Sequence, residues 1–183
     1  MPSQRFETAH RHSQGVSIYR HAASEVIAER YRRLAPACAG SLREDQMPKI
    51  TGGCLCGSVR YASDAEPVLV AVCHCGTCQK YTGSAFSLNL GVPSESVTIT
   101  GESLATYEDR SGASGNPFFR TFCSRCGSPI SGYGSVYSGL TFMKGGTLDD
   151  PSWVRPNAHI WCSEKQPWVM IEEDVAQYPR NPG

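Results

Sequence analysis

Apolar and polar residues alternate through much of the chain with the period of a β-strand. Residues 86–92 read FSLNLGV, in which every second side chain is apolar and its neighbours are small or polar. This alternation predicts a strand with one buried face, whereas the continuous apolar run at 68–72 predicts a strand buried on both faces. The same reasoning predicts further short strands at residues 58–62, 97–99, 104–107, 118–122, 139–143, 159–162 and 168–171.

Glycine and proline divide these segments. The chain of 183 residues contains 18 glycines and 12 prolines, which favour tight turns over helices. After residue 47 we identify no convincing helical pattern. The prediction is therefore a compact, mostly β protein with an antiparallel arrangement of short strands.

The first 46 residues differ from the rest of the chain. They are rich in arginine and carry little strand pattern, so we interpret them as an N-terminal extension of the domain at 47–183. One short helix is predicted within the extension at residues 24–34, where Ser24 is a suitable N-cap and Pro36 follows the end. Translation that begins at Met47 is an alternative explanation of the same boundary.

Charge and hydropathy exclude several classes of partner. The 17 basic and 17 acidic residues balance, which provides no electrostatic basis for binding nucleic acid or an anionic membrane. No run approaches the roughly 18 apolar residues of a membrane-spanning helix. The N-terminus also lacks the apolar segment of a secretory signal, so we predict a cytoplasmic protein, in which disulfides rarely persist.

Cysteine is the residue type with the clearest pattern. Seven of the nine cysteines fall into three clusters, with Cys38 and Cys162 standing alone. The first cluster contains Cys54 and Cys56, the second contains Cys73, Cys75 and Cys78, and the third contains Cys123 and Cys126.

These spacings predict two zinc ions per chain. Cysteines two or three positions apart can direct two thiolates to one ion, and a glycine follows the first and third clusters. Those two pairs together supply the four thiolates of a closed, structural site. The second cluster supplies three thiolates, which leaves one zinc position open, as in a reactive site.

Other uses of the cysteines stay open at this level. Disulfides, an iron–sulfur cluster, or two purely structural zinc sites would each use several of the seven residues. His74 lies between two cysteines, and we expect its side chain to point away from the metal that they share. Cys38 and Cys162 are interpreted as small apolar residues without a metal.

Three ordered segments resemble the glutathione-dependent formaldehyde-activating enzyme family, to which the centromere protein V-like proteins also belong. The segments are GGCLCGSVRY at 52–61, CHCGTCQK at 73–80 and FCSRCG at 122–127, supported by GTLDDP at 146–151, His159-Ile160 and Pro167-Trp168. The resemblance covers about residues 49–171. It implies a compact β fold, a structural zinc on the first and third clusters, and a substrate-site zinc on the second.

The activity that the resemblance implies is carbon–sulfur lyase chemistry, the condensation of formaldehyde with glutathione to S-hydroxymethylglutathione. A small thiol such as glutathione is then the expected partner. Addition of a thiolate to an aldehyde also needs an acid for the resulting oxygen. The candidate residues for that role are His74, Lys80 and His159, while Arg60, Arg110, Arg120 and Arg155 are candidate anchors for a carboxylate.

Two other classes of function compete with the lyase. One is a non-catalytic binding module in which both zinc ions are structural. The other is a thiol or metal sensor whose open zinc site is modified without turnover. The sequence indicates neither the physiological substrate nor the oligomeric state.

Overall fold

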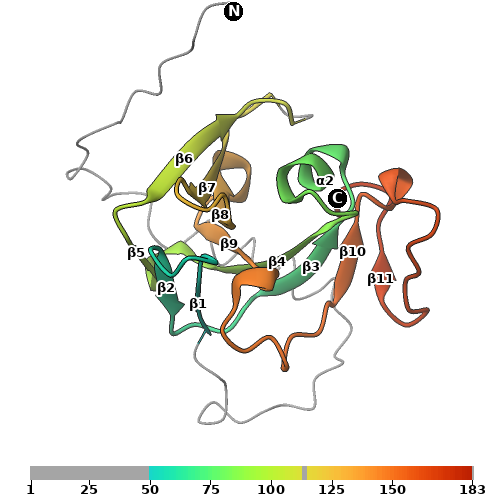
Figure 1. Cartoon of the computed structure of the whole chain (residues 1–183). Helices are drawn as coiled ribbons and strands as arrows, with labels where there is room; N and C mark the ends of the chain where they lie inside the picture. The colour runs from blue at the N-terminus through green and yellow to red at the C-terminus, as the bar shows by residue number, and fades with distance from the viewer. Residues whose placement is uncertain (1–49, 113–114, 183) are drawn as a thin grey trace, which may run out of the picture.

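Two β-sheets form the described part of the chain, which comprises residues 50–112 and 115–182 of a computed structural model (Figure 1). The predicted extension at 1–46, its helix at 24–34 and Cys38 lie outside the described residues, as does the boundary at 47. The larger sheet has eight strands and the smaller has three.

The larger sheet has the strand order β11-β10-β3-β4-β9-β8-β7-β6. Neighbouring strands pair antiparallel from β3 to β6, whereas β10 pairs parallel with both β3 and β11. The strands are β3 (Leu69–Cys73), β4 (Ser87–Pro93), β6 (Leu104–Asp109), β7 (Phe118–Cys123), β8 (Pro129–Gly134), β9 (Leu140–Lys144), β10 (Ala158–Ile160) and β11 (Ala176–Gln177).

The smaller sheet has the order β1-β2-β5 and is antiparallel throughout. Its strands are β1 (Ile50–Gly53), β2 (Arg60–Ser63) and β5 (Val97–Thr100). One α-helix, α2 (Gly76–Thr82), follows β3. Short 3₁₀ turns complete the described elements: η2 (Ser94–Ser96), η3 (Ser135–Tyr137), η4 (Gly145–Thr147) and η5 (Cys162–Glu164).

The predicted fold class is confirmed, because strands dominate and one α-helix is present among the described residues. Strand β3 is buried at all five positions, as the continuous apolar run predicted. The strand predicted at 168–171 is wrong: this segment is turn and coil, and the side chains of Trp168 and Met170 are exposed. Strands β1, β8 and β11 were not predicted, and α2 corrects the expectation that no helix follows residue 47.

Helix α2 has only seven residues, which is too short for a helical pattern of apolar residues to be recognised in the sequence. It is held at its start by groups outside the helix. The Cys75 sulfur accepts from the Cys78 N–H, and the Glu164 carboxylate accepts from the Gly76 N–H at 2.7 Å. Glu164 lies 88 residues from Gly76, so a local search of the sequence around α2 does not include it.

The main core lies between the two sheets. Ile50 and Tyr61 from the smaller sheet belong to one buried apolar cluster with Val70, Leu90 and Met143 from the larger sheet. Residues adjacent to these in β3, β4 and β9 face the opposite side of the larger sheet, because side chains alternate along a strand. That opposite face carries Cys73, Asn89 and Lys144.

A β-bulge changes the direction of side chains in β8. The register between β7 and β8 shifts between Thr121 and Phe122. Ile130 therefore belongs to the main core, whereas Gly132 lies beneath the ring of Phe118 on the other face. No helix in the described ranges is long and apolar enough to cross a membrane.

We expect Leu90→Ala to destabilise the protein by about 3 kcal/mol, because Leu90 is fully buried in the main core. Leu55→Ala is the matched control, since 89% of Leu55 is exposed, and it should change stability by less than about 0.5 kcal/mol. Urea denaturation of both variants measures the difference. Equal effects would mean that this core does not carry the stability of the fold.

Candidate metal centres and the adjoining cavity

The structure brings the predicted cysteines together in two groups. Within each group all sulfur atoms lie within 4.8 Å of one another. One group joins Cys54 and Cys56 to Cys123 and Cys126, and the other consists of Cys73, Cys75 and Cys78. These are the groups that the spacing predicted, and Cys162 belongs to neither.

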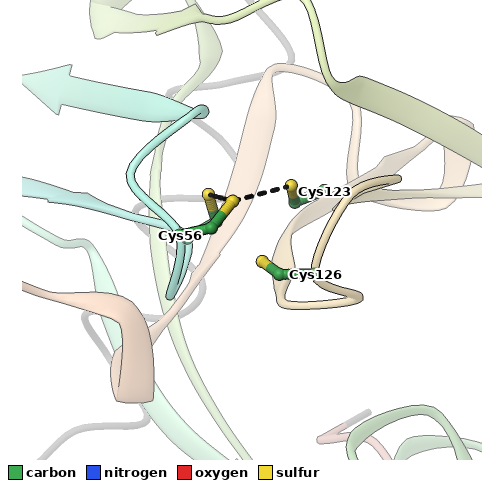
Figure 2. A group of neighbouring side chains, drawn as sticks. Cys56, Cys123 and Cys126 are labelled. Atoms are coloured by element: carbon green, nitrogen blue, oxygen red, sulfur yellow. Dashed lines mark hydrogen bonds between the residues drawn. The ribbon is translucent and has the colours of Figure 1, made fainter.

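The four-cysteine group lies between two facing loops, one before β2 and one between β7 and β8 (Figure 2). Each loop is closed by a glycine with positive φ, 78° at Gly57 and 76° at Gly127. The amide of each glycine donates to the carbonyl of the first cysteine in its loop, at 3.0 Å and 2.8 Å. These turns direct both sulfur atoms of a pair to the same side.

The sulfur spacing in this group fits a tetrahedral zinc ion. Cys54 Sγ and Cys56 Sγ are 3.5 Å apart, and Cys56 Sγ and Cys123 Sγ are 3.8 Å apart. Zinc–sulfur bonds of about 2.3 Å at tetrahedral angles place sulfur atoms about 3.8 Å apart. A disulfide needs about 2.05 Å, so these cysteines are not paired as disulfides.

The environment favours the thiolate form of Cys126 and Cys54, whereas the pKa of Cys56 is raised. Hydrogen bonds from Ser128 lower the pKa of Cys126 to about 5. Burial acts to raise the pKa of Cys54, but hydrogen bonds from the Val59 amide and from neighbouring side chains bring it down to about 7. Deprotonated sulfur is the form that binds a metal.

The three-cysteine group lies where β3 meets α2. Cys73 is the last residue of β3, Cys75 is the N-cap of α2, and Cys78 is buried inside the first turn. Gln79 fixes this loop by donating to the His74 carbonyl at 2.6 Å and to the Glu164 carbonyl at 3.0 Å. The segment after β10 therefore holds the loop in position from outside.

His74 contacts His159 and not the metal group. Its Nε2 lies 2.9 Å from His159 Nδ1, and the two rings stack with centroids 5.2 Å apart. Burial lowers the pKa of His74 to about 4 and also lowers that of His159, so both rings are neutral at pH 7. His74 Nδ1 is buried without a partner. A buried N–H is rarely left unpaired, so we assign the proton to Nε2, which donates to His159.

A cavity of about 390 Å³ opens directly onto the three-cysteine group. Cys73, Cys75 and Cys78 all contribute to its lining, whereas the cysteines of the other group do not. His74, His159 and the exposed Lys80 are also outside the lining. Their predicted catalytic roles stay predictions.

Lys144 is a buried cation in this cavity that the sequence reasoning missed. Only 5% of the residue is exposed, and its Nζ donates to Ser87 Oγ at 3.0 Å and to Asn89 Oδ1 at 2.6 Å. Burial lowers the pKa of Lys144 to about 8, and the nearby cysteines act against that shift. The available signal was a lysine at the end of the apolar strand β9, an unusual place for a charge.

Arg120 is the second buried cation of the cavity. Its Nε donates to Asp109 Oδ2 at 2.8 Å, and both side chains are less than a tenth exposed. Its guanidinium carbon lies 4.9 Å from the centre of the Tyr81 ring and 5.0 Å from that of Phe118. Among the four candidate arginines, only Arg120 lines the cavity.

These cations act on the cysteine group. Hydrogen bonds from Cys73 and Cys75, together with the charges of Lys144 and Arg120, hold the pKa of Cys78 far below its usual range. Asp109 offsets the charge of Arg120, whereas both side-chain acceptors of Lys144 are neutral. The cavity therefore presents positive charge beside a cluster of three sulfur atoms.

Fold and site together define a mostly β protein with two cysteine groups that could hold metal ions, one of them open to a cavity. A family model described as "Glutathione-dependent formaldehyde-activating enzyme" matches residues 49–164. The chain belongs to this family, which confirms the resemblance seen in its sequence motifs.

A curated relative and a solved structure are among the proteins similar to the chain. A protein of Halomonas elongata named "Putative glutathione-dependent formaldehyde-activating enzyme" is 27% identical over 127 residues, which span 67% of this chain and 81% of the relative. A crystal structure of a Rhodobacter sphaeroides protein matches with a TM-score of 0.44 and 18% identity, over 58% of this chain and 91% of that one.

We expect Asp109→Asn to destabilise the protein by about 3 kcal/mol at pH 7, because it leaves the charge of Arg120 buried without a carboxylate. Burial acts to raise the pKa of Asp109, but hydrogen bonds from Ser111 and Arg120 lower it overall. The carboxylate therefore stabilises the fold above its unfolded pKa of about 3.9, and the difference between variant and parent should shrink as the pH falls below that.

The matched control for this prediction is Glu108→Gln, which removes one partner of the exposed pair with Arg110. That change should alter stability by less than about 0.5 kcal/mol. Chemical denaturation at pH 7 and at about pH 2.5, below the unfolded carboxyl pKa, measures both variants. A loss for Asp109→Asn that is no larger than for the control would contradict a structural role for the buried pair.

Proposed function

We propose that this protein is a zinc-dependent carbon–sulfur lyase that forms and cleaves the adduct of a small thiol with an aldehyde. The observation that supports this function is the cavity, which is lined by all three cysteines of one group and by none of the other. A purely structural metal does not need a ligand-sized cavity of about 390 Å³ beside it. Membership of the formaldehyde-activating family supports glutathione and formaldehyde as the first substrates to test.

The donor sets fit two zinc ions with different roles. Cys54, Cys56, Cys123 and Cys126 would hold a closed structural zinc, and Cys73, Cys75 and Cys78 would hold an open one. The open zinc would supply a Lewis-acid position at which a thiol loses its proton. Thiolate chemistry of this kind suits a reducing compartment, so we propose a cytoplasmic location.

Lys144 is proposed to hold the oxygen of the adduct. When a thiolate sulfur forms a bond to the aldehyde carbon, the electron pair of the C=O π bond moves to oxygen, which then takes a proton from water. The Lys144 ammonium lies beside the cysteine group and has donors for Ser87, Asn89 and one further acceptor. A hydrogen bond from this buried donor stabilises the developing oxyanion more than it stabilises the neutral aldehyde.

Arg120 is proposed to balance charge at the same end of the cavity. Three thiolates exceed the charge of one zinc ion by one unit, and a substrate thiolate would add another. Arg120 is fixed by Asp109 and by its position over the Tyr81 ring, so it cannot move away when charge accumulates at Cys78. Such pre-organised charge requires no reorganisation during the reaction.

Zinc analysis of the purified protein tests the two sites. We expect two zinc ions per chain, one per chain after Cys78→Ala, and two after the control change Cys162→Ala. The physical reason is that Cys78 belongs to a metal group and Cys162 does not. A single zinc ion that Cys78→Ala leaves in place would sink the proposal and leave a zinc-stapled binding module.

Exchange NMR with ¹³C-formaldehyde and glutathione tests the activity. The zinc-loaded protein should accelerate exchange between free formaldehyde and its glutathione adduct above the rate in buffer. Lys144→Met should lower this acceleration by about 100-fold, the usual cost of one oxyanion donor. Zinc content and thermal melting of the variant show whether its metal sites and fold are retained.

Lys165→Met is the control for the loss of a lysine, because Lys165 donates to backbone carbonyls away from the cavity lining. It should keep the parental rate. Full acceleration by a folded, zinc-loaded Lys144→Met variant would remove Lys144 from the mechanism. An unmodified protein that gives no acceleration would refute formaldehyde and glutathione as its substrates.

A further inference from the structure

The cavity changes character along one face of the larger sheet. Cys73 is the last residue of β3 and belongs to the three-cysteine group. The next residues along this face of the sheet are Asn89 on β4 and its partner Lys144 on β9. In the next rank of paired residues, Gly91 is opposite Phe142, and Phe142 is opposite Gly132. The sheet register therefore places charged and polar groups near the cysteines and an aromatic surface farther away.

We define the aromatic wall as Phe118, Tyr137 and Phe142, all of which line the cavity. Ring centroids lie 5.1 Å apart for Tyr137 and Phe142, and 6.4 Å apart for Phe118 with either of the other two. The wall continues into Leu69 and Val136, which also line the cavity.

Glycines allow two of these rings to lie directly on the sheet. A Cβ atom at Gly132 would come 2.5 Å from the Phe118 ring, and one at Gly91 would come 3.2 Å from the Phe142 ring. The small residues on β4 and β8 thus leave room for large rings on β7 and β9. This arrangement makes the wall a built part of the cavity.

Neither formaldehyde nor glutathione accounts for this wall. Formaldehyde adds a single carbon to the thiol, and glutathione is charged and polar along its length. The charged lining residues are Asp109, Arg120, Lys144 and Glu164, and Lys144 and Arg120 already act at the cysteine end. An apolar surface in a ligand cavity instead contributes affinity for an apolar substituent.

We propose that the aldehyde of the natural substrate carries an apolar substituent, aryl or alkyl, that packs on the aromatic wall while its carbonyl carbon lies at the three-cysteine group. This inference rests on the proposed lyase function. Phe142 and Lys144 are two residues apart on β9, or about 7 Å along the strand. A substituent of a few carbons, or one benzene ring, spans that distance from an oxygen held at Lys144.

Thioethers of glutathione test the substituent without turnover. S-methylglutathione and S-benzylglutathione differ only in the group that would reach the wall. Calorimetric titration of the zinc-loaded full chain should give at least about 30-fold tighter binding of the benzyl compound, given the apolar area of one ring. Equal affinities, or no binding of either compound, would overturn the inference.

Two matched variants locate the effect. Phe118→Ala should reduce the preference for the benzyl compound to a few-fold, because it removes one ring of the wall. Phe119→Ala, the neighbouring residue, should keep the full preference, since Phe119 stacks on Tyr133 and does not line the cavity. Loss of preference in both variants, or in neither, would contradict the assignment of the wall.

A second variant tests the same assignment in case Phe118→Ala does not fold. Val136 is 46% exposed and lines the cavity, so Val136→Glu adds a charge to the wall without disturbing a buried core. It should also abolish the preference for the benzyl compound, with an unchanged melting temperature. A benzyl preference that Val136→Glu leaves intact would place the substituent elsewhere and overturn the proposal.

The two proposals fail in different ways. A protein that accelerates formaldehyde exchange but binds both thioethers equally keeps the lyase function and loses the apolar substituent. A protein that prefers the benzyl thioether but accelerates no exchange, with formaldehyde or with benzaldehyde, keeps an apolar binding site and loses the lyase function.

Discussion

The close approach of three ionisable sulfur atoms is the constraint on which the functional part of this structure depends. Three sulfur atoms lie within 4.8 Å of one another at the buried end of β3. Their proximity in a low-dielectric environment raises the pKa of Cys73 and of Cys75, and a thiolate at Cys78 needs positive charge nearby. Lys144 from β9 and Arg120 from β7 supply part of it, and both reach the group only because β4, β8 and β9 connect their strands to β3.

The two cysteine groups differ in the number of their sulfur atoms, and therefore in what they can do. The four-cysteine group joins loops that lie 67 residues apart in sequence, and its four sulfur atoms could hold one metal ion. The three-cysteine group is local in sequence: Cys75 caps one short helix and Cys78 lies within it. Its three sulfur-bearing residues line the cavity. The number of sulfur atoms and the surroundings, rather than the type of ligand, distinguish the groups.

The cysteine groups could be predicted because each depends on local spacing. Pairs such as Cys54–Cys56 meet one ion through a tight turn, and a glycine at the right position is visible in the sequence. The alternation at β4 and the apolar run at β3 were equally local signals. Helix α2 was not predictable from its own seven residues, because Glu164 holds its first turn from a distant segment.

The cavity lining could not be predicted, because it depends on sheet register. His74 was a candidate for its position between two metal ligands, but side chains alternate along an extended chain, and this one turns toward β10 and His159. Lys144 lies 66 positions after Cys78 in sequence and reaches it only through the pairing of β4 with β9. Arg120 could not be distinguished from three other arginines until its pairing with Asp109 was known.

The register of the larger sheet also places the charged end of the cavity apart from its aromatic end. Lys144 and Phe142 share a strand and a face, yet one belongs to the charged end and the other to the aromatic wall. The wall depends on Gly91 and Gly132, where an added Cβ atom would first meet the rings of Phe142 and Phe118. A side chain at Gly91 would reshape the apolar end at Phe142. One at Gly132 would instead displace Phe118, the ring against which Arg120 lies. Under the proposed lyase function, the cysteine end would keep one chemistry while the aromatic end determines which aldehyde is accepted.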